Sequence, residues 1–138
     1  MASTLGNSAL WLSFLFSVLQ FIVSTRNNNT IIIFNRIAVT GLLASTLASF
    51  FLLMYCHVTS DFSVINVFQN SHTTKPLLYK ISGVWGNHEG SMLLWMLVLS
   101  ITDYFIFKLY NKKNSIFVSK TLQIQAIITI GFLLFILI

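Results

Sequence analysis

The sequence predicts an all-α membrane protein with four transmembrane helices. Of its 138 residues, 56% are hydrophobic and only 8% are charged, whereas soluble proteins average about 25% charged residues. Four uninterrupted apolar runs are each about as long as a helix needs to cross a hydrocarbon core of roughly 30 Å. Isolated strands cannot satisfy their backbone in lipid. We therefore expect a single membrane domain over residues 1–138.

The four spans are expected at residues 5–23, 37–56, 92–110 and 121–138. The first run holds no charge and ends before Arg26. We interpret it as a retained span, because it is too long for a signal peptide and lacks a basic segment in front of it. The second run closes at His57, the third ends at the Asn-Lys-Lys-Asn tract 111–114, and the fourth runs to residue 138.

Basic residues are concentrated in two of the connections. The end of the third span and the loops that follow the first and third spans hold six of them: Arg26, Arg36, Lys108, Lys112, Lys113 and Lys120. In the loop 57–90, Lys75 and Lys80 are balanced by Asp61 and Glu89. The positive-inside rule places this loop and both chain ends on the outer face. No basic stripe with interleaved aromatics indicates nucleic-acid binding.

Asp103 is the only acid within a predicted span. An intramembrane acid is by default a functional candidate, for example in a proton relay. Here the carboxyl lies toward the inner end of its helix, close to Lys108, which favours a snorkelling, partly hydrated side chain. Cys56 is the single cysteine, so an internal disulfide is excluded, and we interpret it as a small hydrophobe.

The loop 57–90 is too long to be a simple connection. Residues 61–68 begin with an alternating pattern and continue as an extended-looking stretch, and a polar turn region follows at 70–75. Pro76 is a favoured first residue of a helix. After it, apolar side chains recur at helical spacing on one face: Leu77, Leu78, Ile81, Val84 and Trp85. This pattern predicts a short interfacial helix, with Trp85 at headgroup depth.

The run Trp-Gly-Asn-His-Glu-Gly-Ser at 85–91 leads directly into the third span. A purely structural interpretation is a helix start that Ser91 caps, with Glu89 at the positive end of the helix. In the functional interpretation, His88 and Glu89 face a ligand on the outer surface, flanked by Trp85 and Trp95. Such a setting suits a flat aromatic cofactor such as haem. The residues alone favour the structural interpretation.

The histidines do not predict a metal site. Zinc requires three or four convergent ligands, and His57 and His72 have no recognisable ligand spacing to His88. Paired carboxylates, a Ser/His/Asp set and a glycine-rich phosphate loop are also absent from the sequence.

Residues 79–95, Tyr-Lys-Ile-Ser-Gly-Val-Trp-Gly-Asn-His-Glu-Gly-Ser-Met-Leu-Leu-Trp, resemble the signature region of the CcmF family. These cytochrome c-type biogenesis proteins are subunits of the haem lyase of maturation system I. Segments 61–64, 70–71 and 131–137, together with Gly6-Asn7, resemble other parts of the family. Family members are several times longer, and this sequence lacks their Trp-Trp-Asp and His-Pro-Pro motifs. It resembles an amino-terminal portion.

The resemblance implies a part in attaching haem covalently to apocytochrome c, as membrane scaffold rather than as a catalyst alone. Trp85, His88, Glu89 and Trp95 would then be haem-platform or partner contacts. The family's haem histidines lie downstream, so the axial ligands would come from outside this chain. Implied partners are the rest of the family protein, a haem chaperone, other maturation factors and apocytochrome c.

Two other functions stay open at this point. A small respiratory-complex subunit, proton-translocating or structural, requires ionisable residues in the membrane, and only Asp103 qualifies. A simple membrane anchor leaves the 85–91 run unexplained. Abundant Ile and Asn with scarce Arg indicate A+T-rich codons. We therefore expect a mitochondrial inner membrane, with a bacterial cytoplasmic membrane as the alternative, and the loop 57–90 in the intermembrane space or periplasm.

Overall fold

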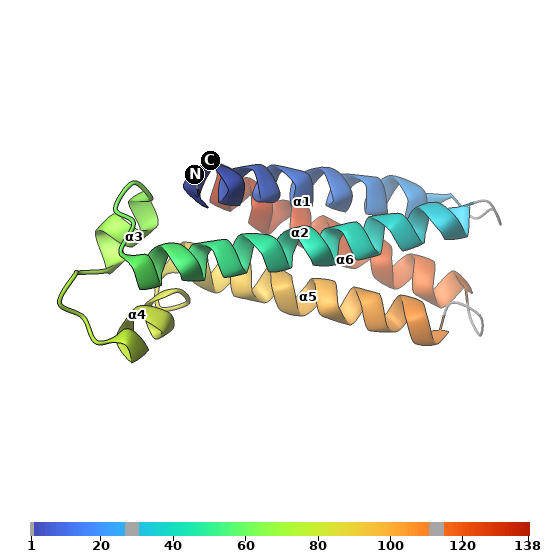
Figure 1. Ribbon diagram of the computed structural model, residues 1–138. Coiled ribbons are helices and arrows are strands. Elements are labelled where there is room, and N and C mark those ends of the chain that lie inside the picture. Colours follow the sequence, from blue (N-terminus) through green and yellow to red (C-terminus); the bar gives the residue numbers. More distant parts are fainter. Residues whose placement is uncertain (1, 27–30, 111–114) are drawn as a thin grey trace.

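The computed structural model describes residues 2–26, 31–110 and 115–138 and places four long helices in an antiparallel bundle (Figure 1). They are α1 (Ala2–Thr25), α2 (Ile31–Thr59), α5 (His88–Tyr110) and α6 (Ser115–Leu137). Both α1 and α5 pack against α2 and α6. Each of the four is long and apolar enough to cross a membrane, so the predicted fold class is confirmed.

The helices extend beyond the apolar runs that predicted them. Hydropathy marks the residues that suit lipid, whereas a helix continues through polar residues until its backbone is capped. In α2 this cap is a turn in which the Asp61 N–H donates to the Cys56 carbonyl at 2.9 Å. Ser60 takes the left-handed conformation that this turn requires, with φ of 54°. His57 therefore lies within α2 rather than after it.

Two apolar clusters hold the bundle together. The first lies toward the end that carries the loop and contains Phe50, Val84, Leu93, Met96, Leu97 and Leu133. The second lies toward the opposite end and contains Val39, Phe107, Val118 and Leu122. Val84 belongs to the loop and is fully buried, so its burial fixes the loop against the bundle.

Buried polar contacts join the helices between these clusters. Ser13 Oγ donates to Ser45 Oγ at 2.9 Å, and Thr46 and Ser100 share a hydrogen bond of 3.0 Å. Polar contacts of this kind link helices in membranes, where the bundle interior offers their only partners.

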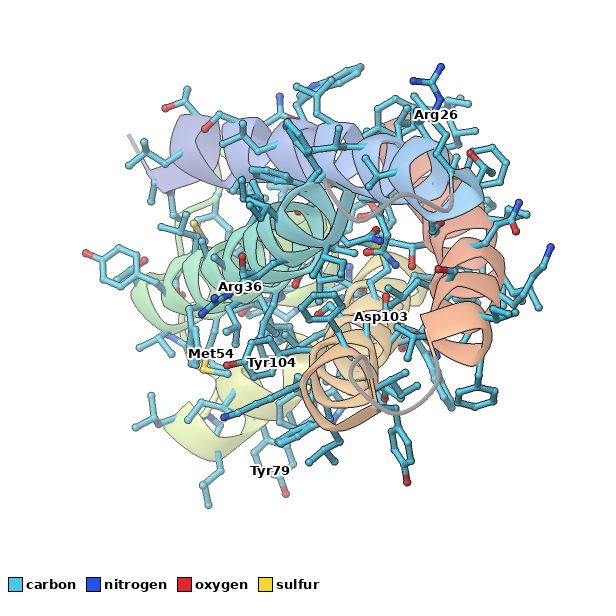
Figure 2. The ribbon with its side chains drawn as sticks, turned by 90° about the vertical axis from the view of Figure 1, so that its right-hand side faces the viewer. Arg26, Arg36, Met54, Tyr79, Asp103 and Tyr104 are labelled. Carbon is cyan, nitrogen blue, oxygen red and sulfur yellow. The ribbon has the colours of Figure 1, made fainter. Side chains whose placement is uncertain are left out.

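Asp103 is fully buried, so the expectation of a snorkelling, hydrated carboxyl is wrong. Gln20 Nε2 donates to Asp103 Oδ2 at 2.8 Å. The amide nitrogen of Gln125, in the orientation that satisfies both of its polar atoms, donates to Asp103 Oδ1. Figure 2 shows Asp103 among the helices, whereas Arg26 lies at the periphery. Amides from α1 and α6 thus take the place that water was expected to fill.

Both chain ends and the segment between α2 and α5 lie at one end of the bundle (Figure 1). The last turns of α1 and α5 and the first turns of α2 and α6 lie at the other end, so Arg26, Arg36, Lys108 and Lys120 share one end as predicted. Lys112 and Lys113, like the tract 27–30, fall outside the described residues.

The segment between α2 and α5 contains two short helices, α3 (Ile65–Asn70) and α4 (Leu77–Gly83). The short helix predicted after Pro76 is confirmed as α4. The extended stretch predicted at 65–68 is wrong, because these residues begin α3. Asn66 and Val67 are buried whereas Ile65 and Phe68 are exposed, and over so few residues alternation does not separate a strand from a short helix.

Candidate functional site

The start of α5 is capped by Asn87. Its Oδ1 accepts a hydrogen bond from the Gly90 N–H at 2.8 Å, as expected for an Asn that precedes the first helical turn. The prediction that Ser91 caps the helix is wrong, because α5 begins one turn earlier. Ser91 Oγ instead donates to the Trp85 carbonyl at 2.6 Å. Glu89 does lie in the first turn, where the helix dipole favours a carboxylate.

Gly90 allows the loop backbone to pass directly over the first turn of α5. A Cβ atom at this position would collide with the carbonyl oxygen of Val84. Since Val84 is fully buried, neither segment has room to move aside. Glycine at position 90 is thus required by a close backbone approach.

Asn66, Asn87 and Glu89 form what we call the amide–carboxylate cluster. Asn66 Nδ2 donates to Asn87 Oδ1 at 2.9 Å, and Asn87 Nδ2 donates to Asn66 Oδ1 at 3.1 Å. Asn66 Nδ2 also donates to Glu89 Oε2 at 2.6 Å. Asn87 Nδ2 reaches the Gly83 carbonyl as well, at 3.1 Å. The cluster therefore joins α3, the end of α4 and the start of α5.

Sequence reasoning missed both asparagines of this cluster. Asn87 carried a usable signal, because Asn is a favoured cap immediately before a helix. Asn66 carried none, since it lies 21 residues from Asn87 in the sequence.

The charged side chains of the loop are bound within the loop itself. Lys75 Nζ donates to the Asn70 carbonyl and Lys80 Nζ to Ser60 Oγ, each at 2.7 Å. Asp61 Oδ1 accepts from Ser63 Oγ at 2.6 Å and from the Ser63 N–H at 3.1 Å. Both hydrogen bonds lower the pKa of Asp61 below its ordinary value, and the one from the Ser63 hydroxyl has the larger effect.

A partly open cavity of about 430 Å³ lies beside the cluster. It is bounded by the first turns of α1, the last turns of α2, the start of α3, the start of α5 and the end of α6. The side chains around it are Ala2, Ser3, Gly6, Asn7, Leu10, Ser49, Leu52, Leu53, Cys56, Ser63, Val64, Ile65, Asn66, Glu89, Leu93 and Ile136. Its size is that of a small-molecule site.

The structure separates the four predicted contact residues. Glu89 lines the cavity, whereas Trp85, His88 and Trp95 do not. His88 and Trp95 are exposed and two helical turns apart, which places them on one outward face of α5. Trp85 lies in the turn before α5 with 40% of its surface exposed.

The histidines of this chain do not meet at one site. His57 is fully buried, and its Nε2 has no hydrogen-bond partner among the described residues. His72 and His88 are exposed, and no histidine lines the cavity. In the described ranges, no three His, Cys, Asp or Glu side chains gather as a metal-ion site would require. The residues present therefore do not fit a haem held by two axial ligands from this chain.

Four apolar helices of membrane length, with a folded loop fixed over the start of the third, define a polytopic helical membrane protein. No protein-family model matches the chain. It is 42% identical over 130 residues to the cytochrome c-type biogenesis protein CycK of Bradyrhizobium diazoefficiens, covering 94% of this chain and 20% of that protein. Cytochrome c-type biogenesis proteins named CcmF and CycK are homologues of this chain, which matches a portion of each of them.

A second relative is the cytochrome c-type biogenesis protein CcmF of Haemophilus influenzae. It is 37% identical over 141 aligned positions, which cover 99% of this chain and 22% of that protein. The chain thus spans about a fifth of the length of the curated relatives it matches. A solved structure described as the cytochrome c heme lyase CcmF superposes with a TM-score of 0.88 at 24% identity, over 96% of this chain and 23% of that one. This likeness shows that the fold is shared.

Proposed function

We propose that the chain supplies part of the membrane scaffold of a cytochrome c haem lyase and acts in cytochrome c maturation. The observation that carries the proposal is the 42% identity to a cytochrome c-type biogenesis protein over 94% of the chain. In this proposal the complete protein attaches haem covalently to apocytochrome c. This chain contributes positioning rather than acid–base chemistry, since the reaction depends on holding haem and thiols in a fixed pose.

The outward face of α5 and the turn before it are the proposed contact region. Trp85, His88 and Trp95 are exposed at or near the loop end of the bundle, where aromatic rings supply large, rigid contact area. Glu89 lies on the side of α5 that lines the cavity, where it accepts the hydrogen bond from Asn66 in the amide–carboxylate cluster. Haem is held by axial ligands from outside this chain. The partners are the rest of the family protein, a haem chaperone, other maturation factors and apocytochrome c.

One observation favours a second candidate, a membrane subunit of a respiratory complex. Asp103 is a fully buried acid inside a membrane-length helix, and such residues often belong to proton paths. Its side-chain partners among the described residues are the amides of Gln20 and Gln125, which serve equally well to join three helices. Co-purification separates the two candidates. We expect a tagged chain to recover cytochrome c maturation factors from its native membrane, whereas recovery of an intact respiratory complex would contradict the proposal.

The bacterial relatives favour a bacterial cytoplasmic membrane over the mitochondrial inner membrane that the composition predicts. We place the segment between α2 and α5 on the outer, periplasmic face. The test introduces Lys112→Cys into a Cys56→Ala chain and adds a membrane-impermeant thiol reagent to each side. The matched control is His72→Cys, in the loop. Position 112 should react only from the inside and position 72 only from the outside; the reverse pattern would refute this orientation.

A further inference from the structure

The cavity beside the amide–carboxylate cluster changes in character along the bundle axis. Near the loop end its walls carry the polar side chains of Ser3, Asn66 and Glu89, beside the apolar Ile65 and Ile136. One or two turns deeper, toward the middle of the bundle, leucines predominate, with Leu10, Leu52, Leu53 and Leu93 beside the polar Ser49. A mainly apolar depth below a mouth with polar groups suits a ligand with an alkyl chain and a polar head.

One charged side chain lies around the cavity, and it is acidic. Glu89 is the only ionisable acid or base, apart from the Cys56 thiol, among the side chains around the cavity. One carboxylate oxygen, Oε2, accepts the hydrogen bond from Asn66, and no described residue donates to Oε1. The loop cations do not compete for it, because Lys75 and Lys80 donate elsewhere. A carboxylate with a free oxygen attracts a cationic donor and repels an anion.

We propose that this cavity binds an amine-headed amphiphile of the membrane, with its ammonium group at Glu89 and its alkyl chain among the leucines of α1, α2 and α5. The proposal does not depend on the haem-lyase function. It assigns the ligand class from the polarity gradient and the single carboxylate. A bound metal ion is a poorer fit, since the described ranges hold no cluster of metal ligands.

Cys56 provides the readout, because it is the single cysteine and lines the cavity. The rate of its reaction with N-ethylmaleimide is measured on the full chain in a non-ionic detergent. Decylamine, decanol and decanoate serve as probes with matched chains and different heads. At a probe concentration of about ten times its Kd, the rate should fall about elevenfold, since only the unoccupied fraction reacts. We expect decylamine to protect at the lowest concentration and decanoate at the highest.

Two variants and one matched control test the site. Gly6→Leu should abolish protection, because an added Cβ at position 6 meets only Leu52, at 3.8 Å, so the longer side chain has room to enter the cavity. Gly131→Leu is the same substitution in open space on α6, where no atom lies within 4 Å of an added Cβ, and it should retain protection. Glu89→Gln should remove the advantage of decylamine over decanol.

Equal protection by all three probes would overturn the proposal, because it would indicate partition without recognition of the head. Protection that survives Gly6→Leu, or a Cys56 thiol that never reacts in the folded chain, would also overturn it. If Gly6→Leu fails to fold, the Glu89→Gln comparison still decides whether the carboxylate selects the amine.

Discussion

Replacing Asn87 by alanine is expected to loosen the start of α5 and release α3 from it, while the four-helix bundle stays intact. Asn87 accepts hydrogen bonds from the Gly90 N–H and from Asn66 Nδ2, and donates to Asn66 Oδ1 and the Gly83 carbonyl. Among the described side chains, Asn87 alone is hydrogen-bonded to α3, to the end of α4 and to the first turn of α5. The change therefore acts on the arrangement that holds Glu89 and Trp85 in place.

The size of the effect follows from the bonds that are lost. Loss of an Asn cap costs about 1 kcal/mol. Loss of the two hydrogen bonds between the side-chain amides of Asn87 and Asn66 adds about 1 kcal/mol. The cost is modest because water can replace part of this bonding at a partly exposed site. A total of about 2 kcal/mol in the free energy of local opening corresponds to roughly a thirtyfold change in its equilibrium constant. Asn87→Ser should show a smaller effect, since serine is also a favoured cap and only the bonds to Asn66 and the Gly83 carbonyl are lost.

Hydrogen exchange followed by mass spectrometry measures this opening. Amide protection of α3 and of the first turn of α5 should fall about thirtyfold in Asn87→Ala, and that of α1 and α6 should not change. Gln69→Ala is the control, because Gln69 is exposed on α3 and makes no side-chain hydrogen bond with the described residues. Unchanged protection in Asn87→Ala, or an equal fall in the control, would refute the role given to the cluster.

Three other changes have defined outcomes. Gly90→Ala should displace the start of α5, because its Cβ would meet the loop backbone. Hydrogen exchange should then show a loss of amide protection at the start of α5 at least as large as in Asn87→Ala. Asp103→Leu should lower the free energy of unfolding in detergent by roughly 1–3 kcal/mol, because it leaves buried amides without their acceptor, and Asp103→Asn should lower it less. Ser63→Ala should raise the pKa of Asp61 toward its ordinary value of 3.8. In the unaltered chain, the Asp61–Ser63 hydrogen bonds are fully present above pH 3.8 and are lost as the pH falls through the lowered pKa of Asp61. An NMR titration of the Asp61 carboxyl group measures both pKa values.

The bundle was predictable because transfer of side chains into lipid dominates the choice of spans. Long apolar runs report that transfer directly, so the four helices and the fold class followed from the sequence. The ends of the helices could not be predicted in the same way, because the caps depend on local hydrogen bonds. Ser60 in a left-handed turn and Asn87 at the start of α5 are polar residues whose role appears only with the backbone in place.

The errors concern polar side chains whose partners are distant in sequence. Asp103 was expected to reach water, but Gln20 lies 83 residues away along the chain and 2.8 Å away in space. Asn66 looked like part of an extended segment, yet it anchors Glu89 from α3. Of the four predicted contact residues, the sequence correctly placed Glu89 at the helix start. It gave no sign that Glu89 and His88 face different sides of α5.

The central claim is that the turn before α5 and its first residues act in cytochrome c maturation, beyond their part in the fold. The most direct measurement compares covalent haem on cytochrome c with the abundance of this protein in membranes, for Trp85→Ala, Glu89→Ala and the Gln69→Ala control. Glu89 contributes about 0.3–1 kcal/mol to its helix start and accepts a hydrogen bond from Asn66, and neither contact belongs to the apolar clusters that hold the bundle together. We predict that attached haem falls well below the level that abundance explains in the first two variants, and stays normal in the control. A fall only in proportion to abundance would contradict the claim.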